Sequence, residues 1–259
     1  MRRRVAVKIA YLGDGFAGSQ IQPGLRTVEG EVLSNIMMLG NTDEKDTDLR
    51  CASRTDRGVN ALGNVVVFNT CFDDDLILLK ALNAVSKDVY YRSAATVEET
   101  FNPRHADERI YRYVLPAAGI DLSSAERCAA LFEGEHDFAR FCKADGKSTV
   151  MDMRSVKICT NDDVIVIEFR SEYFLWNMIR RIVAAISSVG RGDASLNDVR
   201  KALNGEQISF GLARPDALTL TDVVYNRIRF VKPAADMFDG RIEEEMFRWS
   251  LRKAFFVSL

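Results

Sequence analysis

Strand-like and helix-like segments alternate irregularly along the 259 residues, and this order constrains the fold more than any other feature of the sequence. Alternating apolar residues and short β-branched runs predict strands, whereas apolar residues three and four apart predict helices. Strands are expected at 4–12, 65–68, 88–97, 109–115, 154–159, 164–170 and 220–231. Helices are expected at 28–39, 76–85, 124–132, 172–189, 196–203 and 240–256, three of them with the N-caps Thr27, Asp74 or Asp75, and Ser195. The order and the intervening turns favour α+β architecture with mainly antiparallel sheets.

A linker-like segment near the middle of the chain divides it. Residues 101–106 show neither helical nor strand periodicity, and Pro103 disfavours helix at Asn102. Strand-rich and helix-rich segments occur on both sides of this linker. The sequence therefore predicts two α+β domains, 1–105 and 106–259.

The composition is that of a globular protein and does not indicate a nucleic-acid binder. Hydrophobic residues make up 47% of the chain, charged residues 28%, and the net charge is −2. No apolar run is long enough to cross a bilayer, and the first residues lead directly into a strand, so we expect a cytoplasmic protein without membrane contact. Residues 174–192 contain three arginines and no acid, which leaves room for a local basic face.

Cysteine and histidine usage argues against a metal site. The five cysteines are widely spaced and include no Cys-x-x-Cys pair, and the chain has only two histidines. Disulfide frameworks and zinc sites need closer groups of such residues. We expect reduced thiols and no bound metal.

The polar loop 53–60 is the strongest candidate for chemistry. It places Asp56 between Arg54 and Arg57, and Gly58 follows, which adopts backbone angles that other residues resist. A loop mounted on a stiff strand is a common position for catalytic groups. Flanking arginines would keep the carboxylate ionised for nucleophilic attack. From these residues alone, a surface turn with incidental ion pairs is an equal alternative.

The segment Arg54-Thr55-Asp56-x-Gly58-Val59-x-Ala61 resembles the active-site motif of the A-type tRNA pseudouridine synthases. Three further segments resemble that family in the same order, namely Arg109-Ile-Tyr-Arg-Tyr113, Phe174-Leu-Trp-Asn-Met-Ile-Arg-Arg-Ile-Val183 and Ala217-Leu-Thr-Leu-Thr-Asp-Val-Val-Tyr225. The resemblance implies that Asp56 is the catalytic residue, that Tyr111 is the active-site tyrosine, and that Arg180 pairs with Asp56. For an isolated tyrosine on a strand, a purely structural role would be the usual interpretation.

The same resemblance implies a set of substrate contacts. Arg54, Thr55 and Arg57 would contact RNA around Asp56, Arg181 would meet a phosphate, and Leu220 would pack under the target base. Several positions depart from the usual family pattern: Arg57 replaces alanine, Asn60 replaces histidine, Ala217 replaces glycine, and Trp176 and Asn177 replace two histidines.

The implied protein is a cofactor-free, metal-free isomerase that converts uridine to pseudouridine in the anticodon arm of tRNA, around positions 38 to 40. The base would be flipped out and stacked on Tyr111, which could also accept the C5 proton. Family members have two ferredoxin-like domains that meet at a basic cleft, and they are homodimers. We therefore expect tRNA and a second copy of the chain as partners.

Two other classes of function are alternatives. A non-catalytic RNA-binding or RNA-folding protein on the same scaffold would not need Asp56. An aspartate-dependent phosphotransferase or hydrolase would bring Mg²⁺ ligands and a phosphate-binding glycine loop. The segment Gly146-Lys-Ser148 imitates the end of such a loop, but Phe141 stands where its first glycine is required.

Overall fold

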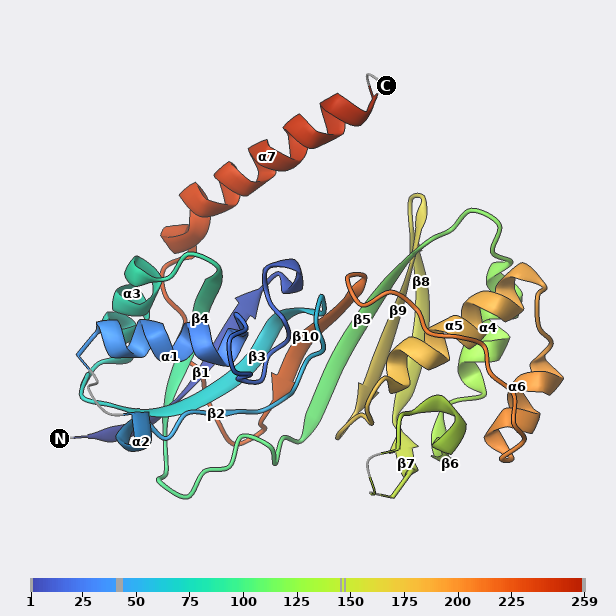
Figure 1. Cartoon of the computed structure of the whole chain (residues 1–259), viewed down its shortest axis with the longest axis horizontal. Coiled ribbons are helices and arrows are strands. Elements are labelled where there is room, and N and C mark those ends of the chain that lie inside the picture. Colours follow the sequence, from blue (N-terminus) through green and yellow to red (C-terminus); the bar gives the residue numbers. More distant parts are fainter. Residues whose placement is uncertain (1, 41–43, 145, 147, 258–259) are drawn as a thin grey trace.

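The structure, a computed structural model, describes residues 2–40, 44–144, 146 and 148–257 (Figure 1). The strands of the main sheet are β1 (Arg3–Tyr11), β2 (Arg50–Cys51), β3 (Asn60–Thr70), β4 (Val89–Val97), β5 (Glu108–Pro116), β8 (Ser155–Asn161), β9 (Val164–Ser171) and β10 (Leu218–Val224). A separate hairpin-like sheet pairs β6 (Gly134–Asp137) with β7 (Val150–Met153). The helices are α1 (Val28–Met38), α2 (Glu44–Thr47), α3 (Asp75–Val85), α4 (Leu122–Ala130), α5 (Met178–Arg191), α6 (Leu196–Leu203) and α7 (Asp239–Val257), with short 3-10 turns η1 (Gly13–Gly15), η2 (Ala139–Phe141) and η3 (Ala235–Phe238).

One eight-stranded sheet runs through both halves of the described chain, in the order β4-β1-β3-β10-β5-β9-β8 with β2 beside β3. Neighbouring strands are antiparallel except β3 and β10, which pair in parallel. The expected α+β class with mainly antiparallel pairing is confirmed. The basic cleft between two domains stays a prediction.

The C-terminal part of the chain crosses back to the first half. Strand β10 lies between β3 and β5, and Val231 forms a bridge with Ala94 of β4. The last segment before α7 therefore lies beside the N-terminal strands, as Figure 1 also shows. The division into domains 1–105 and 106–259 stays a prediction.

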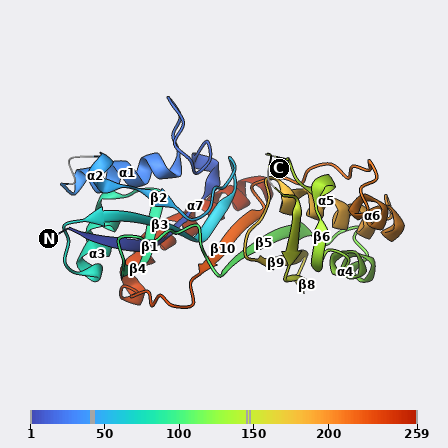
Figure 2. The same cartoon turned by 90° about the horizontal axis from the view of Figure 1, so that it is seen from below.

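Helices cover the two ends of the sheet separately. Helices α1 and α3 pack near β4, whereas α4 packs on α5 and β8 (Figures 1 and 2). Residues 65–68 of β3 are fully buried on both of its faces, as their β-branched and aromatic run predicts. The polar loop 53–59 thus joins a strand that the core holds rigidly.

Two elements are shorter than their sequence patterns predict. Helix α5 begins at Met178 rather than at 172, because Asn177 is left-handed with φ of 62° and the Trp176 carbonyl accepts from the Lys143 amide at 2.8 Å. The strand expected over 220–231 is β10, which ends at Val224. There the chain turns, and the Asn226 amide donates to the Asp107 carboxylate at 2.7 Å.

Capping side chains determine where several of the helices begin. Thr27, Asp74 and Ser195 cap α1, α3 and α6 as expected, the last with a full capping box. Helix α4 begins at Leu122 rather than 124, because the Asp121 carboxylate caps it by accepting from the Ser124 amide at 2.7 Å.

The acidic stretch 44–48 includes the helical turn α2, and Asp43 lies outside the described residues.

Helix α7 extends away from the rest of the protein (Figure 1), and none of its described residues is buried. Its apolar side chains are therefore exposed, which distinguishes it from α1, α3, α4, α5 and α6. Neither α7 nor another helix in the described part of the chain combines the length and apolar character needed to cross a membrane.

Candidate active site

A cavity of about 840 Å³ lies where the polar loop, strand β5 and the segment leading into α5 converge. Asp56 and the loop arginines form one side of it, Tyr111 comes from β5, and Arg180 comes from the first turn of α5. The cavity thus gathers all four sequence segments that carry the candidate residues. The fourth segment, on β10, contributes Leu218.

Asp56 and Arg180 form an ion pair, with Nη1 of the arginine 3.6 Å from the carboxylate. The arginine side chain is 14% exposed and the carboxylate 38% exposed. Nε of Arg180 donates to the Ala213 carbonyl at 2.7 Å, and Nη1 also donates to Oδ1 of Asn177 at 3.2 Å. The guanidinium is therefore fixed by neutral acceptors, while the carboxylate remains open to the cavity.

Asp56 pairs with a distant arginine rather than with its sequence neighbours. Arg54 and Arg57 are exposed and line the cavity, but among the described residues the ion pair of Asp56 involves Arg180. The two loop arginines are thus free to face a polyanion in solvent.

Thr55 is turned into the protein and is only 7% exposed. Its hydroxyl is 2.8 Å from the Tyr11 hydroxyl, its amide donates to Oγ of Ser19 at 2.8 Å, and its carbonyl accepts from the Ser19 amide at 3.0 Å. Although it lines the cavity, the geometry gives Thr55 an anchoring position below Asp56.

The turn after Asp56 depends on Gly58. Its φ is 83°, and a Cβ atom there would lie 3.2 Å from Cγ of Pro215. The Val59 amide closes the turn by donating to the Asp56 carbonyl at 3.1 Å. Glycine is thus required both for the backbone angle and for the approach of the segment that holds Arg180.

Tyr111 lies in the floor of the cavity and is 7% exposed. Its ring meets Phe174 edge to face, with centroids 5.2 Å apart. Burial raises the pKa of its phenol above the usual range, although the nearby Arg109 opposes the shift. Tyr111 is therefore a neutral phenol at physiological pH.

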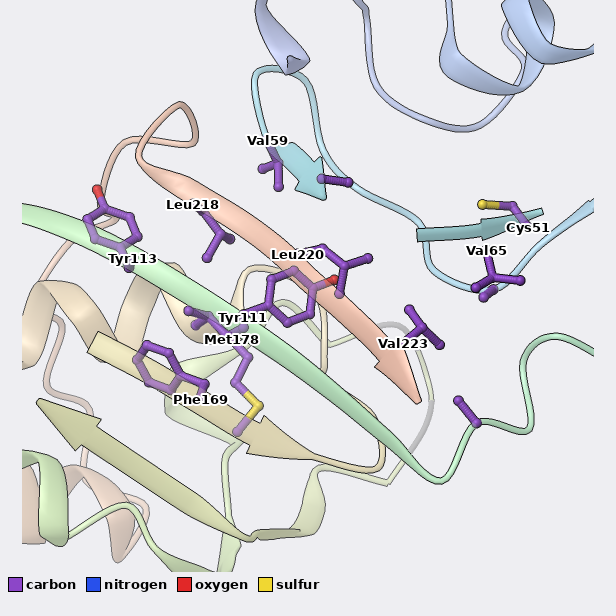
Figure 3. Packing of buried hydrophobic residues seen from close by; sticks show 14 of the residues in the cluster. Cys51, Val59, Val65, Tyr111, Tyr113, Phe169, Met178, Leu218, Leu220 and Val223 are labelled. Atoms are coloured by element: carbon purple, nitrogen blue, oxygen red, sulfur yellow. The ribbon is translucent and has the colours of Figure 1, made fainter. Parts of the chain in front are cut away.

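Leu220 and Arg181 do not line this cavity. Leu220 is fully buried on β10 and pairs in register with Tyr111, and Figure 3 shows the two side chains beside each other. Leu218, two residues earlier on the same strand face, reaches the cavity wall instead. Arg181 has a buried Nε without a hydrogen-bond partner among the described groups.

Arg109 is a site residue that the sequence did not single out. It is 7% exposed and lines the cavity, and its guanidinium donates to Oγ of Ser53 at 2.8 Å and to the Ala52 carbonyl at 3.0 Å. It also donates to the carbonyls of Arg104, at 3.0 Å, and Glu172. Arg109 thereby ties the start of the polar loop to the end of β9. The only signal in the sequence was its place at the head of the Arg-x-Tyr-x-Tyr segment.

The chain matches a family model described as tRNA pseudouridine synthase over residues 128–226, which include Arg180 and β10. This match covers less than half of the chain, and it indicates the class of the pseudouridine synthases, which are isomerases.

Curated relatives narrow the class. The chain is 40% identical to tRNA pseudouridine synthase A of Pyrococcus abyssi, over 97% of this chain and 96% of that protein. The proteins of the same name from Pyrococcus horikoshii (39% identity, 97% of each chain) and Thermococcus onnurineus (41% identity, 88% of this chain and 86% of that protein) are similar. The chain belongs to the tRNA pseudouridine synthase A family. It is therefore an isomerase of tRNA uridine rather than a binding protein or a phosphotransferase.

A solved Cbf5-Nop10-Gar1 complex is only weakly similar, with a TM-score of 0.34 and 12% identity over 71% of this chain and 45% of that chain.

Proposed function

We propose that this isomerase acts on the anticodon arm of tRNA, around positions 38 to 40, and that Asp56 is its catalytic carboxylate. The observation that carries the assignment of Asp56 is its ion pair with Arg180 in a cavity with Tyr111 in its floor. A uridine stacked in an RNA helix cannot reach such a cavity, so the target nucleotide has to be flipped out.

The reaction breaks the bond between C1′ and N1, rotates the uracil and joins C1′ to C5, after which C5 loses its proton. Asp56 contributes either by attacking C1′ or by removing a proton from the sugar. Both routes require an ionised and accessible carboxylate, which is what the Arg180 contact and the 38% exposure of Asp56 supply. Arg180 acts as a positioning residue for that carboxylate.

Tyr111 acts on the base rather than on the sugar. An aromatic ring in the cavity floor offers a stacking surface for uracil. Because burial raises its pKa, the phenol keeps its own proton at neutral pH and is better suited to donate a hydrogen bond than to accept the C5 proton. We therefore assign Tyr111 a binding and orienting role.

Local charge would hold the RNA despite the net charge of −2. The cavity is lined by Arg54, Arg57 and Arg104 as well as by Arg109 and Arg180. Exposed arginines bind phosphates and release counterions, so we expect affinity for tRNA to fall steeply with salt. The predicted basic cleft would be an extension of this cavity.

The test of the target position is to map pseudouridine in a tRNA transcript with uridine at positions 38, 39 and 40, using carbodiimide adducts that stop reverse transcriptase. Stops at one or more of these positions, lost in transcripts with cytidine there, are the expected result. Stops confined to other regions would contradict the anticodon-arm proposal and leave the isomerase class untouched.

We also propose that the protein is a cytoplasmic homodimer and that α7 pairs with the α7 of a second copy. Ile242, Met246, Trp249 and Phe256 follow each other at helical spacing on one face, and each is about half exposed or more, from 49% to 69%. Packing this apolar face against another apolar surface would remove it from water and so stabilise the helix.

The charges of α7 favour an antiparallel pair. Its first half carries the run 243–245 of three glutamates, and its second half carries Arg252 and Lys253. Turning one helix against its copy would bring each acidic run near the basic half of the other, whereas a parallel pair would place like charges together. A second copy is therefore a better occupant than an acidic or a basic partner.

A further inference from the structure

Trp176 lies in the wall of the active-site cavity and is 47% exposed. It belongs to the segment between β9 and α5, whose other aromatic residues divide between two environments. Phe174 packs against Tyr111 in the floor, whereas Tyr173 is 42% exposed and lines the cavity with Trp176. An exposed indole in a cavity wall offers an accessible surface on which a base can stack.

One face of the indole is occupied by a cation. Nζ of Lys143 lies 3.8 Å from the ring centroid, and the Lys143 amide donates to the Trp176 carbonyl at 2.8 Å. The first contact covers one face of the ring, and the second holds the backbone of Trp176 in place. With 47% of the residue exposed, the indole still presents apolar surface to the cavity, next to a positive charge.

Trp176 is also coupled rigidly to the catalytic pair. The next residue, Asn177, is held in the left-handed region with φ of 62°, and its side chain accepts from Arg180, which contacts Asp56. The indole thus has a defined distance from the reacting carboxylate. Trp176 lines the same cavity as Asp56 and Tyr111.

We propose that Trp176, backed by Lys143, forms a second base-binding subsite, which stacks an unpaired nucleobase adjacent to the target uridine in the RNA. The inference rests on the proposed function, since it assumes that an RNA strand enters this cavity. Stacking on an aromatic face suits any base, and the ammonium group beside the ring suits the phosphate that joins the two nucleotides.

The geometry favours a base over other ligands. Phosphate alone would use Lys143 and the loop arginines and would leave the indole exposed. The cavity of about 840 Å³ is larger than one uracil requires, and two exposed aromatic residues, Tyr173 and Trp176, line it in addition to Tyr111. Single-stranded RNA presents bases that are splayed out in sequence, which is the arrangement such a pair of aromatic sites would hold.

The first test uses Trp176 fluorescence. The chain has two tryptophans, so Trp249→Phe leaves Trp176 as the only indole, and Asp56→Asn prevents turnover. An anticodon stem-loop RNA should quench this signal on binding. The same RNA with an abasic nucleotide on one side of the target uridine should bind without quenching. Equal quenching by RNAs that are abasic on either side would overturn the subsite.

The second test is a double-mutant cycle in which the Kd for RNA is measured with and without the Trp176 side chain and with and without the neighbouring base. Removing the neighbouring base should raise the Kd of the protein about tenfold, and Trp176→Ala should raise it by a similar factor for intact RNA. Combining the abasic RNA with Trp176→Ala should raise the Kd no further than either change alone, because both changes remove the same contact. If the two changes raise the Kd by factors that multiply when they are combined, the proposal is overturned. Trp176→Phe, which keeps an aromatic face, should retain most of the affinity and controls for misfolding.

These binding experiments are independent of catalysis. If wild-type protein isomerises no tRNA and yet the cycle shows coupling, the proposed function fails and the second base-binding subsite stands. If tRNA is isomerised at the expected positions and the cycle shows no coupling, only the subsite fails.

Discussion

Arg180 is held by two neutral acceptors before it meets Asp56. Its Nε contacts the Ala213 carbonyl and its Nη1 contacts both Asn177 and the carboxylate. Only a planar guanidinium presents donors in this fork, because a lysine ammonium cannot reach such acceptors together from one atom. The orientation of the charge therefore matters as well as its presence.

Arg180→Lys should consequently lower kcat for tritium release by about 30-fold, corresponding to roughly 2 kcal/mol of lost positioning, while tRNA binding changes little. Steady-state kinetics with tRNA labelled at C5 of uridine measure both parameters. Arg200→Lys, at an exposed position of α6, is the matched control and should behave as wild type. Wild-type kcat in Arg180→Lys would contradict the orienting role.

At the residue scale, the sequence predicted which residues belong to the site better than it predicted the contacts that their side chains make. The family resemblance pointed to Asp56 and to Arg180 as its partner, and the structure places these two in an ion pair, whereas local charge alone suggested Arg54 and Arg57. Likewise Thr55 faces inward, and Leu218 rather than Leu220 reaches the cavity. Such details depend on how distant segments pack, which spacing along the chain does not encode.

At the scale of elements, helix starts were predictable where one side chain decides them. Ser195 and Asp74 cap the helices that follow them through bonds within three residues. The start of α5 was not predictable, because the left-handed Asn177 and the Lys143–Trp176 contact are set by tertiary packing. The apolar pattern over 172–177 belongs to the cavity wall instead of a helix.

The turn after Asp56 allows a matched pair of glycine substitutions. Gly58 and Gly205 both have positive φ, 83° and 94°, but only Gly58 has a neighbour, Pro215, within 4 Å of an added Cβ atom. Gly205→Ala should cost about 1 kcal/mol in free energy of unfolding, and Gly58→Ala about 2 kcal/mol or more.

Urea unfolding of both variants measures this difference. Gly58→Ala should also lower kcat, because Pro215 and Ala213 belong to the same segment that holds Arg180. Equal stability losses and unchanged activity would mean that the turn tolerates a side chain.

At the scale of the whole molecule, a single sheet joins the halves, and its core buries several ionisable groups in their neutral forms. Burial raises the pKa of the Cys51 and Cys128 thiols to about 12. It also raises, above the usual range, the pKa of five tyrosines: Tyr11, Tyr91, Tyr111, Tyr113 and Tyr225. In an unfolded chain these groups would ionise near their ordinary values of about 8.5 and 10.

Stability should therefore be complete below about pH 8.5 and fall as pH rises through the ordinary thiol and phenol values, because the unfolded chain then releases protons that the folded chain retains. Urea midpoints measured between about pH 7.5 and pH 11 test this, with a steeper loss above pH 10, where the tyrosines contribute. A constant midpoint over that range would contradict the burial of these groups.

The proposed α7 pair predicts that oligomeric state depends on its apolar stripe. Met246→Glu combined with Trp249→Glu should convert a dimer to a monomer in sedimentation equilibrium, because two charges would enter the paired face. Met38→Glu is the control, since Met38 is 67% exposed on α1, outside α7. A dimer that survives the double substitution would move the interface elsewhere.

The central claim is that Asp56 performs the chemistry, and tritium release from tRNA transcribed with 5-³H-uridine tests it most directly. Wild-type protein should release tritium, and Asp56→Asn, which keeps the shape of the side chain, should release none while binding tRNA normally. Asp163→Asn, in the exposed turn between β8 and β9, should match wild type. Equal release by wild type and Asp56→Asn would contradict the account and remove Asp56 from the catalytic site.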